Sequence, residues 1–144
     1  MSGMRAGMTY PTWPDMNGSV IPDVVFHNEM WNVENFVNYD KSVYMPTLVQ
    51  ILHRSVAYIL TGLILVFFWR ARDIKLKPFK LTSRLLITML VIQFLLGVFT
   101  IINCKGTIPV GLGSLHQGGA IILLSFSLFV NYLLSQKNEL SKTT

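Results

Sequence analysis

The chain has 144 residues, of which 51% are hydrophobic and only 13% are charged, and its formal net charge is +5. This composition excludes a pair of ordinary soluble domains and is typical of an integral membrane protein. The positive charge is gathered in one short stretch, and no aromatic residues are interleaved with it on an exposed face. This disfavours a surface for nucleic acid, so no nucleic-acid partner is expected.

Residues 1–47 are predicted to form a loop segment outside the membrane. Two prolines and an Asn-Gly pair within residues 11–18 prevent a continuous helix and favour successive turns. Further along, we expect a short amphipathic helix on the outer surface within residues 29–44. The aromatic side chains of this segment either anchor it in the lipid headgroups, which is the favoured interpretation, or cap the outer end of a helix bundle. They are Tyr10, Trp13, Trp31 and Tyr44.

Residues 48–136 contain three long apolar runs. These are residues 48–69, 85–102 and 112–134. At a rise of about 1.5 Å per residue, each run is long enough, or nearly so, to cross a hydrocarbon core of about 30 Å. The sequence therefore predicts an all-α integral membrane protein with three transmembrane helices in a lipid bilayer.

The stretch that joins the first two runs sets the expected orientation. Residues 70–80 and Arg84 are strongly basic, and by the positive-inside rule they lie in the cytoplasm, or in the matrix of a mitochondrion. Lys137 and Lys142, in a tail at residues 137–144, then fall on the same side. We expect a multi-pass protein of a bacterial cell membrane or a mitochondrial inner membrane, with the N-terminal segment outside and the C-terminus inside.

Three further features of the chain concern a cysteine, a histidine and the N-terminal segment. Cys104 is the only cysteine, so no disulfide forms within the chain, and we interpret it as a bystander. His27 is expected to be solvated near the interface. The segment before the first run lacks the apolar core of a signal peptide, and we expect that sequence preceding Met1 is missing.

His53 and His116 each lie near the outer start of an apolar run, where an ionisable side chain marks a functional site. Both are placed about 6 to 8 Å below the outer edge, at about 1.5 Å per residue. Small residues one turn further on, Gly119 and Ala120 after His116, are expected to leave room for a flat macrocycle. Two neutral imidazoles at one depth predict the axial ligands of one haem iron. The alternative is that each histidine hydrogen-bonds across helices, and zinc is disfavoured because no third ligand lies at that depth.

Each histidine is followed by a polar residue, Arg54 or Gln117, which we assign to the cofactor-binding surroundings. Arg54 is predicted to pair with a haem propionate, the alternative being that it reaches a lipid phosphate. The middle run supplies no iron ligand. Its Gln93, Gly97 and Thr100 fall on one side and predict close helix packing.

Three motifs of the chain resemble the haem A synthase family, whose members make the haem of cytochrome oxidase. They are Ala-Gly-Met-Thr-Tyr-Pro-Thr-Trp-Pro-Asp-Met-Asn-Gly at residues 6–18, Val-Gln-Ile-Leu-His-Arg at 49–54 and Leu-His-Gln-Gly-Gly-Ala at 115–120. Members resemble two fused four-helix bundles, and this chain is similar to the second half only. The resemblance implies that the three helices form part of a four-helix bundle, and that the N-terminal four-helix half, or a partner chain, is missing.

The resemblance also implies an oxidoreductase that converts a methyl group of the substrate haem O, by successive hydroxylations, to the formyl group of haem A. In this family the second half is held to carry a haem b cofactor for electron transfer, with His53 and His116 as the matching axial ligands. Since the first half is thought to hold the substrate, we expect that the chain alone is inactive, and no catalytic residue is assigned. One alternative is a small bis-histidine haem b membrane anchor that transfers electrons without chemistry of its own. Another is a haem-free assembly or structural protein.

Overall fold

The structure is a computed structural model that describes the backbone of residues 6–142 and the side chains of residues 6–136. Lys137, Lys142 and the two ends of the chain, which the predicted outer segment and tail include, lie outside the described side chains. The elements in chain order are α1 (Ala6–Thr9), η1 (Asp23–Phe26), η2 (Asn28–Trp31), α2 (Val33–Val37), α3 (Met45–Ala71), α4 (Lys77–Ile102) and α5 (Val110–Lys142). The described backbone is therefore helical and contains no β-strand.

The helices α3, α4 and α5 are long and apolar enough to cross a membrane. Most of their large apolar side chains point outward and are exposed, for example Leu63 at 61% and Ile121 at 68%. Exposing this much apolar surface to water would cost about 25 cal/mol for each Å², whereas lipid tails accept it. The chain is thus a multi-pass integral membrane protein, and the predicted all-α class with three membrane-spanning helices is confirmed.

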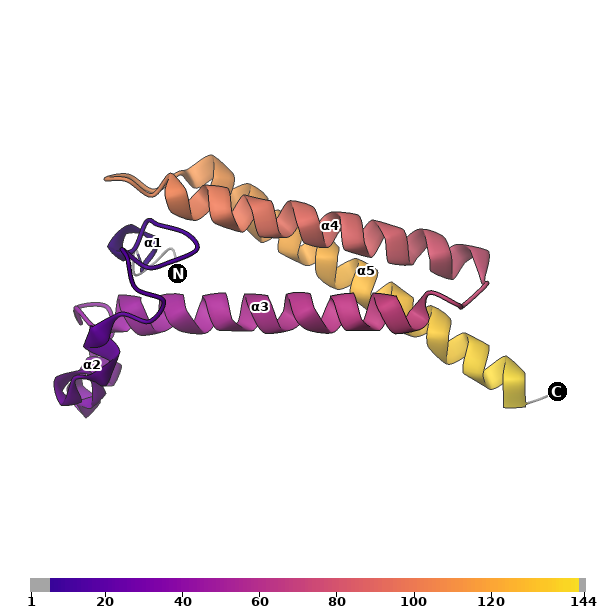
Figure 1. The fold of residues 1–144 in the computed structure, drawn as a ribbon, viewed down its shortest axis with the longest axis horizontal. Helices are drawn as coiled ribbons and strands as arrows, with labels where there is room; N and C mark the ends of the chain where they lie inside the picture. The colour runs from indigo at the N-terminus through magenta and orange to yellow at the C-terminus, as the bar shows by residue number, and fades with distance from the viewer. Residues whose placement is uncertain (1–5, 143–144) are drawn as a thin grey trace.

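The three long helices pack unevenly. Helix α5 crosses close behind α4 for much of its length, whereas α3 stands apart from α4 at its outer end and approaches it at the other (Figure 1). The buried apolar core lies along these contacts and consists of Ile64, Ala71, Phe79, Leu86, Leu90, Leu123 and Val130. Because this core is concentrated away from the outer end of α3, that end is held mainly by other contacts.

The helix ends differ from the predicted runs. Helix α4 begins at Lys77 rather than at residue 85, and α3 continues to Ala71, so the connection between them is reduced to residues 72–76. Backbone hydrogen bonding continues through the basic residues because a helix does not have to end where the hydrocarbon ends, and a proline is tolerated in the first turn of α4. At the other end, α5 continues as a helix to Lys142.

The outer segment forms short helices instead of one amphipathic helix within residues 29–44. The turn η2 ends at Trp31, and a separate helix, α2, starts after Asn32. The side chain of Asn32 accepts a hydrogen bond from the backbone N–H of Glu34, as an N-cap residue does. Asparagine at this position therefore divides the segment into two pieces.

A tight turn closes the loop that follows α1. Met16 N–H donates to the Ser19 carbonyl oxygen at 2.7 Å, across a turn formed by Asn17 and Gly18. Both turn residues have positive φ, 56° and 94°, a conformation that asparagine and glycine adopt more readily than other residues. The predicted turn at the Asn-Gly pair is confirmed. In Figure 1 this loop and α1 lie between the outer ends of α3 and α4.

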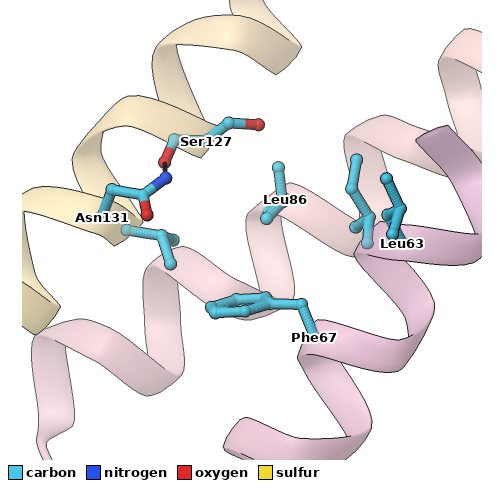
Figure 2. Close-up of a pocket in the computed structure, with 7 residues that line it drawn as sticks. Leu63, Phe67, Leu86, Ser127 and Asn131 are labelled. Atoms are coloured by element: carbon cyan, nitrogen blue, oxygen red, sulfur yellow. Dashed lines mark hydrogen bonds between the residues drawn. The ribbon is translucent and has the colours of Figure 1, made fainter.

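A cleft of about 190 Å³ lies between the inner parts of the three helices. Figure 2 shows Leu63, Phe67 and Leu86 lining it from α3 and α4, with Ser127 and Asn131 on α5. The Asn131 side chain donates to the Ser127 carbonyl oxygen at 2.9 Å. The Asn131 amide nitrogen therefore already has an acceptor within α5, and most of the residues that line the cleft are apolar.

Candidate functional site

His53 on α3 and His116 on α5 face each other near the outer ends of their helices. Their ring centroids are 6.1 Å apart, and the ring planes are inclined by 73°. His53 is exposed and His116 is half-buried, so the pair is accessible from the surface of the three-helix unit. The predicted juxtaposition of these two rings is confirmed, whereas ligation of iron by them stays a prediction.

His116 is held against the middle helix α4 by Gln93. The Gln93 Nε2 group donates to the His116 carbonyl oxygen at 2.7 Å and lies 3.1 Å from His116 Nδ1. Gln93 is 9% exposed, so this contact is shielded from its surroundings. The Gln93 contact leaves His116 Nε2 as the ring nitrogen without a hydrogen bond to any described side chain.

Because position 97 is a glycine, the His116 ring can pack closely against α4. A Cβ atom at Gly97 would lie 3.0 Å from His116 Cε1, closer than ordinary van der Waals contact. Together with Gln93, this glycine explains the cluster of small and weakly polar residues on one side of the middle run. The predicted close packing at Gln93 and Gly97 is confirmed. The group that packs against them is the His116 ring.

The separation of the two rings fits a single iron between them. An imidazole nitrogen binds a metal ion at about 2.0 Å and the ring centroid lies about 1 Å further, so two axial ligands of one iron have centroids about 6 Å apart. The observed 6.1 Å meets this requirement. No group of three or more His, Cys, Asp or Glu side chains suited to a metal ion occurs among the described residues, but a haem iron needs only two such ligands from the protein.

The small residue after His116 has a different neighbour from the one expected. A Cβ atom at Gly119 would overlap Gln93 Oε1 and lie 2.9 Å from Met89 Cε, so this position faces α4. Gly119 is buried, and Ala120 is exposed. The expectation that Gly119 clears space for a macrocycle was wrong, because this position packs against α4.

Arg54, directly after His53, binds the outer loop. Its guanidinium donates to carbonyl oxygens of residues 10–15, a set of partners that the sequence analysis did not anticipate. The acceptors are Tyr10, Thr12, Pro14 and Asp15, at 3.4, 2.7, 3.3 and 2.7 Å. One turn earlier on α3, the fully buried Gln50 donates from Nε2 to the Tyr10 carbonyl oxygen at 2.8 Å. Arg54 and Gln50 therefore anchor the loop beside the histidine pair.

Trp13 extends this anchoring to α4. Its Nε1 group donates to the Tyr58 hydroxyl at 3.1 Å, and its ring meets the edge of Phe94 with 5.9 Å between centroids. Trp13 thus lies between α4 and the middle of α3. For this residue the structure favours contact with the helix bundle over the expected belt anchoring.

The remaining candidate residues lie outside these contacts. Gln117 is exposed on α5, and its side chain makes no hydrogen bond to another described residue. His27 is exposed between η1 and η2, as expected for a solvated histidine. Cys104 is buried, and its thiol donates to the Thr100 carbonyl oxygen at 3.1 Å.

Comparison with known proteins finds a matching family and several relatives. Residues 1–128 match the model of the COX15-CtaA family, described as cytochrome oxidase assembly protein. Three relatives are each named heme A synthase. That of Nitrosospira multiformis is 34% identical over 95% of this chain and 36% of the relative. Those of Sinorhizobium medicae and Pelagibacter ubique are 33% and 32% identical, over 89% and 92% of this chain and 32% and 36% of the relatives.

The matches cover nearly all of this chain but only part of each relative. The chain spans about a third of the length of the curated relatives it matches. No solved structure matches the chain.

Proposed function

The chain belongs to the COX15-CtaA family of cytochrome oxidase assembly proteins, and we propose that it is the C-terminal, haem b-binding part of a haem A synthase. The observation that carries this proposal is the pair of imidazoles, His53 and His116, with 6.1 Å between their centroids. Neutral imidazole is a common ligand of haem iron, and a bis-histidine site suits electron transfer.

A bound haem would supply one-electron transfer, and the residues of this chain would hold it in place. His53 and His116 would hold the haem iron through one imidazole nitrogen each, from α3 and α5. Gln93 and Gly97 seat the His116 ring on α4. On the outer side, Arg54 holds the loop of residues 10–15 beside the same part of α3.

Arg54 is still the nearest candidate for a haem propionate, although its terminal nitrogens already bind loop carbonyls. Its Nε atom is buried and has no hydrogen-bond partner among the described residues. A propionate would therefore have to share the guanidinium with the loop. Gln117, exposed on the same turn of α5 as His116, is proposed to contact the cofactor edge.

In the complete enzyme, we propose that this unit supports the oxidation of a haem O methyl group to the formyl group of haem A. The relatives named heme A synthase are about three times as long as the stretch that this chain matches. The substrate site would come from the N-terminal four-helix half or from a partner chain, which would also complete the four-helix bundle. Alone, the chain would bind haem b without converting haem O.

We propose the orientation that the charge pattern predicts. The connection at residues 72–76, with basic residues on both sides, lies in the cytoplasm or the mitochondrial matrix. The loop of residues 10–15 and the histidine pair are then at the opposite, outer side. The C-terminus is inside.

A membrane anchor for electron transfer is the second candidate, because the three described helices bring the histidine pair together by themselves. To test both, the chain is purified in detergent with haem, and its oxidised and reduced spectra are recorded. We expect a Soret band that shifts on reduction and is lost in His53→Ala and His116→Ala, while the exposed His27→Ala control keeps it. A wild-type chain without this band would reject both candidates.

Haem A formation separates the two candidates. The chain is expressed together with the N-terminal half of a relative in cells that lack haem A synthase, and extracted haems are separated by chromatography. Haem A should form with the wild-type chain and be absent with His116→Ala. Restored electron flow without any haem A would instead establish the anchor.

A further inference from the structure

The amide of Gln93 is the only described side-chain group within hydrogen-bond distance of His116 Nδ1. Its Nε2 atom lies 3.1 Å from Nδ1 and 2.7 Å from the His116 carbonyl oxygen. Its Oε1 atom is buried and has no hydrogen-bond partner among the described residues. A buried carbonyl without a hydrogen bond is destabilising, so Oε1 is an acceptor beside the histidine that a donor would stabilise.

The orientation of this amide determines which ring nitrogen of His116 carries the proton. When Nε2 of Gln93 donates to Nδ1, the neutral imidazole has its proton on Nε2. When Oε1 of Gln93 faces Nδ1 instead, Nδ1 carries the proton and donates it, and the lone pair of His116 Nε2 is free. Only the second state can bind iron through Nε2.

We propose that Gln93 is a positioning residue that selects the tautomer of His116, and that its amide turns toward Nδ1 with Oε1 when the axial ligand is in use. This inference rests on the proposed haem-binding function. A metal-bound histidine almost always donates its other ring N–H to a nearby acceptor, which fixes the ring and increases its basicity. Gln93 Oε1 is an acceptor at that place which is otherwise unused.

Glycine at position 119 leaves space for the amide of Gln93. A Cβ atom there would overlap Gln93 Oε1, so a larger residue at this position would obstruct the amide. The last torsion of a glutamine side chain is soft, so the torsion itself does not oppose the turn. In the turned state Oε1 takes the place of Nε2 beside the His116 carbonyl oxygen, where Nε2 donates at 2.7 Å, and two acceptors there repel each other. The turn is therefore expected only when a ligand at His116 Nε2 requires the proton on Nδ1. The His116 carbonyl that loses the Gln93 donor lies within α5 and keeps its helical acceptor role.

The first test needs no haem. The chain is labelled with ¹⁵N-histidine, and the chemical shifts of the two ring nitrogens of His116 are measured in detergent. In the wild type, we expect the proton on Nε2. In Gln93→Leu, which keeps a side chain of similar size without an amide, the two tautomers should become mixed. An identical tautomer in the wild type and Gln93→Leu would overturn the proposal.

The second test measures haem affinity, midpoint potential and the electron paramagnetic resonance of the oxidised haem. Gln93→Leu should weaken haem binding about 10- to 100-fold and raise the midpoint potential, because the axial histidine loses its acceptor. Gln93→Glu keeps an acceptor and should restore the affinity, with a potential below that of the wild type. Ser83→Ala, which removes another buried polar group from the inner part of α4, serves as the control and should change neither value.

The outcomes separate this inference from the proposed function. A wild-type chain that binds haem through both histidines, with Gln93→Leu and Gln93→Glu equal to it in potential and resonance, would overturn the role of Gln93 alone. If the wild type binds no haem, the proposed function fails and the nitrogen shifts still decide the tautomer. If Gln93→Leu does not fold, an unchanged potential in Gln93→Glu overturns the proposal.

Discussion

The guanidinium of Arg54 donates to the carbonyl oxygen of Asp15 at 2.7 Å, and this contact ties the outer loop to the turn of α3 that carries His53. Three further loop carbonyls accept from the same guanidinium. The loop and the histidine site are therefore mechanically connected, although they lie about forty residues apart in the chain.

Replacing Arg54 with Ala should release this loop. Hydrogen bonds to a charged group contribute about 1.5 to 3 kcal/mol each, but these bonds share one side chain at a partly exposed place, so we expect a total loss of about 2 to 3 kcal/mol. Amide hydrogen exchange should accelerate at Asn17, whose N–H donates to the Thr12 hydroxyl at 2.7 Å. Arg70→Ala, an exposed arginine on the same helix, is the matched control and should leave this exchange unchanged.

The membrane-spanning helices were predictable because lipid imposes a length and a composition on every crossing segment. The ends of α4 and α5 were not, since helical hydrogen bonding continues past the last apolar residue. The histidine pair was predictable in the same way, as helical rise converts sequence position into depth. Two rings near the outer starts of parallel segments had to lie at similar heights.

The partners of the site residues were harder to predict. Arg54 binds backbone carbonyls, which every residue has, so no pattern of side chains in the sequence predicts these partners. Gln93 did carry a signal, as a strongly polar amide within an apolar run, placed one turn before Gly97. This spacing puts the amide and the glycine on one face of α4, but the ring that they hold comes from a different helix.

Replacing Gly97 with Ala should disturb the His116 ring directly. The added Cβ atom would lie 3.0 Å from His116 Cε1, so the ring has to move by a few tenths of an ångström. We expect haem affinity to fall about tenfold, at the lower end of the range for altered support of a metal ligand. Gly62→Ala, where the new methyl group faces open space on α3, should bind haem as the wild type does. Equal affinities of the two variants, measured by spectral titration, would contradict this account of Gly97.

The adjacent glycines of α5 provide a second matched pair. Gly119→Ala places a Cβ atom onto Gln93 Oε1 and 2.9 Å from Met89 Cε, and such overpacking costs about 1 to 3 kcal/mol. Gly118→Ala meets no neighbour and should stabilise the helix by about 0.5 to 1 kcal/mol. In detergent, the thermal unfolding temperature should therefore fall in Gly119→Ala and rise in Gly118→Ala. A common shift would show that α5 does not pack on α4 through Gly119.

Cys104 offers a test of packing at the outer end of α4. Its side chain is 5% exposed, and a Cβ atom at Gly7 would lie 3.1 Å from its Sγ atom, so α1 covers the thiol. Burial raises the pKa of the Cys104 thiol. The folded chain therefore keeps the proton at a pH where the unfolded chain, with an ordinary value of about 8.5, has released it.

Two results follow for the pH dependence of Cys104. Alkylation by iodoacetamide should be much slower in the folded chain than in chain unfolded by dodecyl sulfate, and the difference should be largest around pH 8 to 9, near the ordinary pKa of about 8.5. Because the folded pKa is the higher one, the stability that the protonated thiol contributes is complete below the unfolded pKa and is lost as pH rises through the folded pKa. With a single cysteine in the chain, the label reports this site alone. Equal rates in the folded and unfolded chain at pH 8 would show that α1 does not cover the thiol.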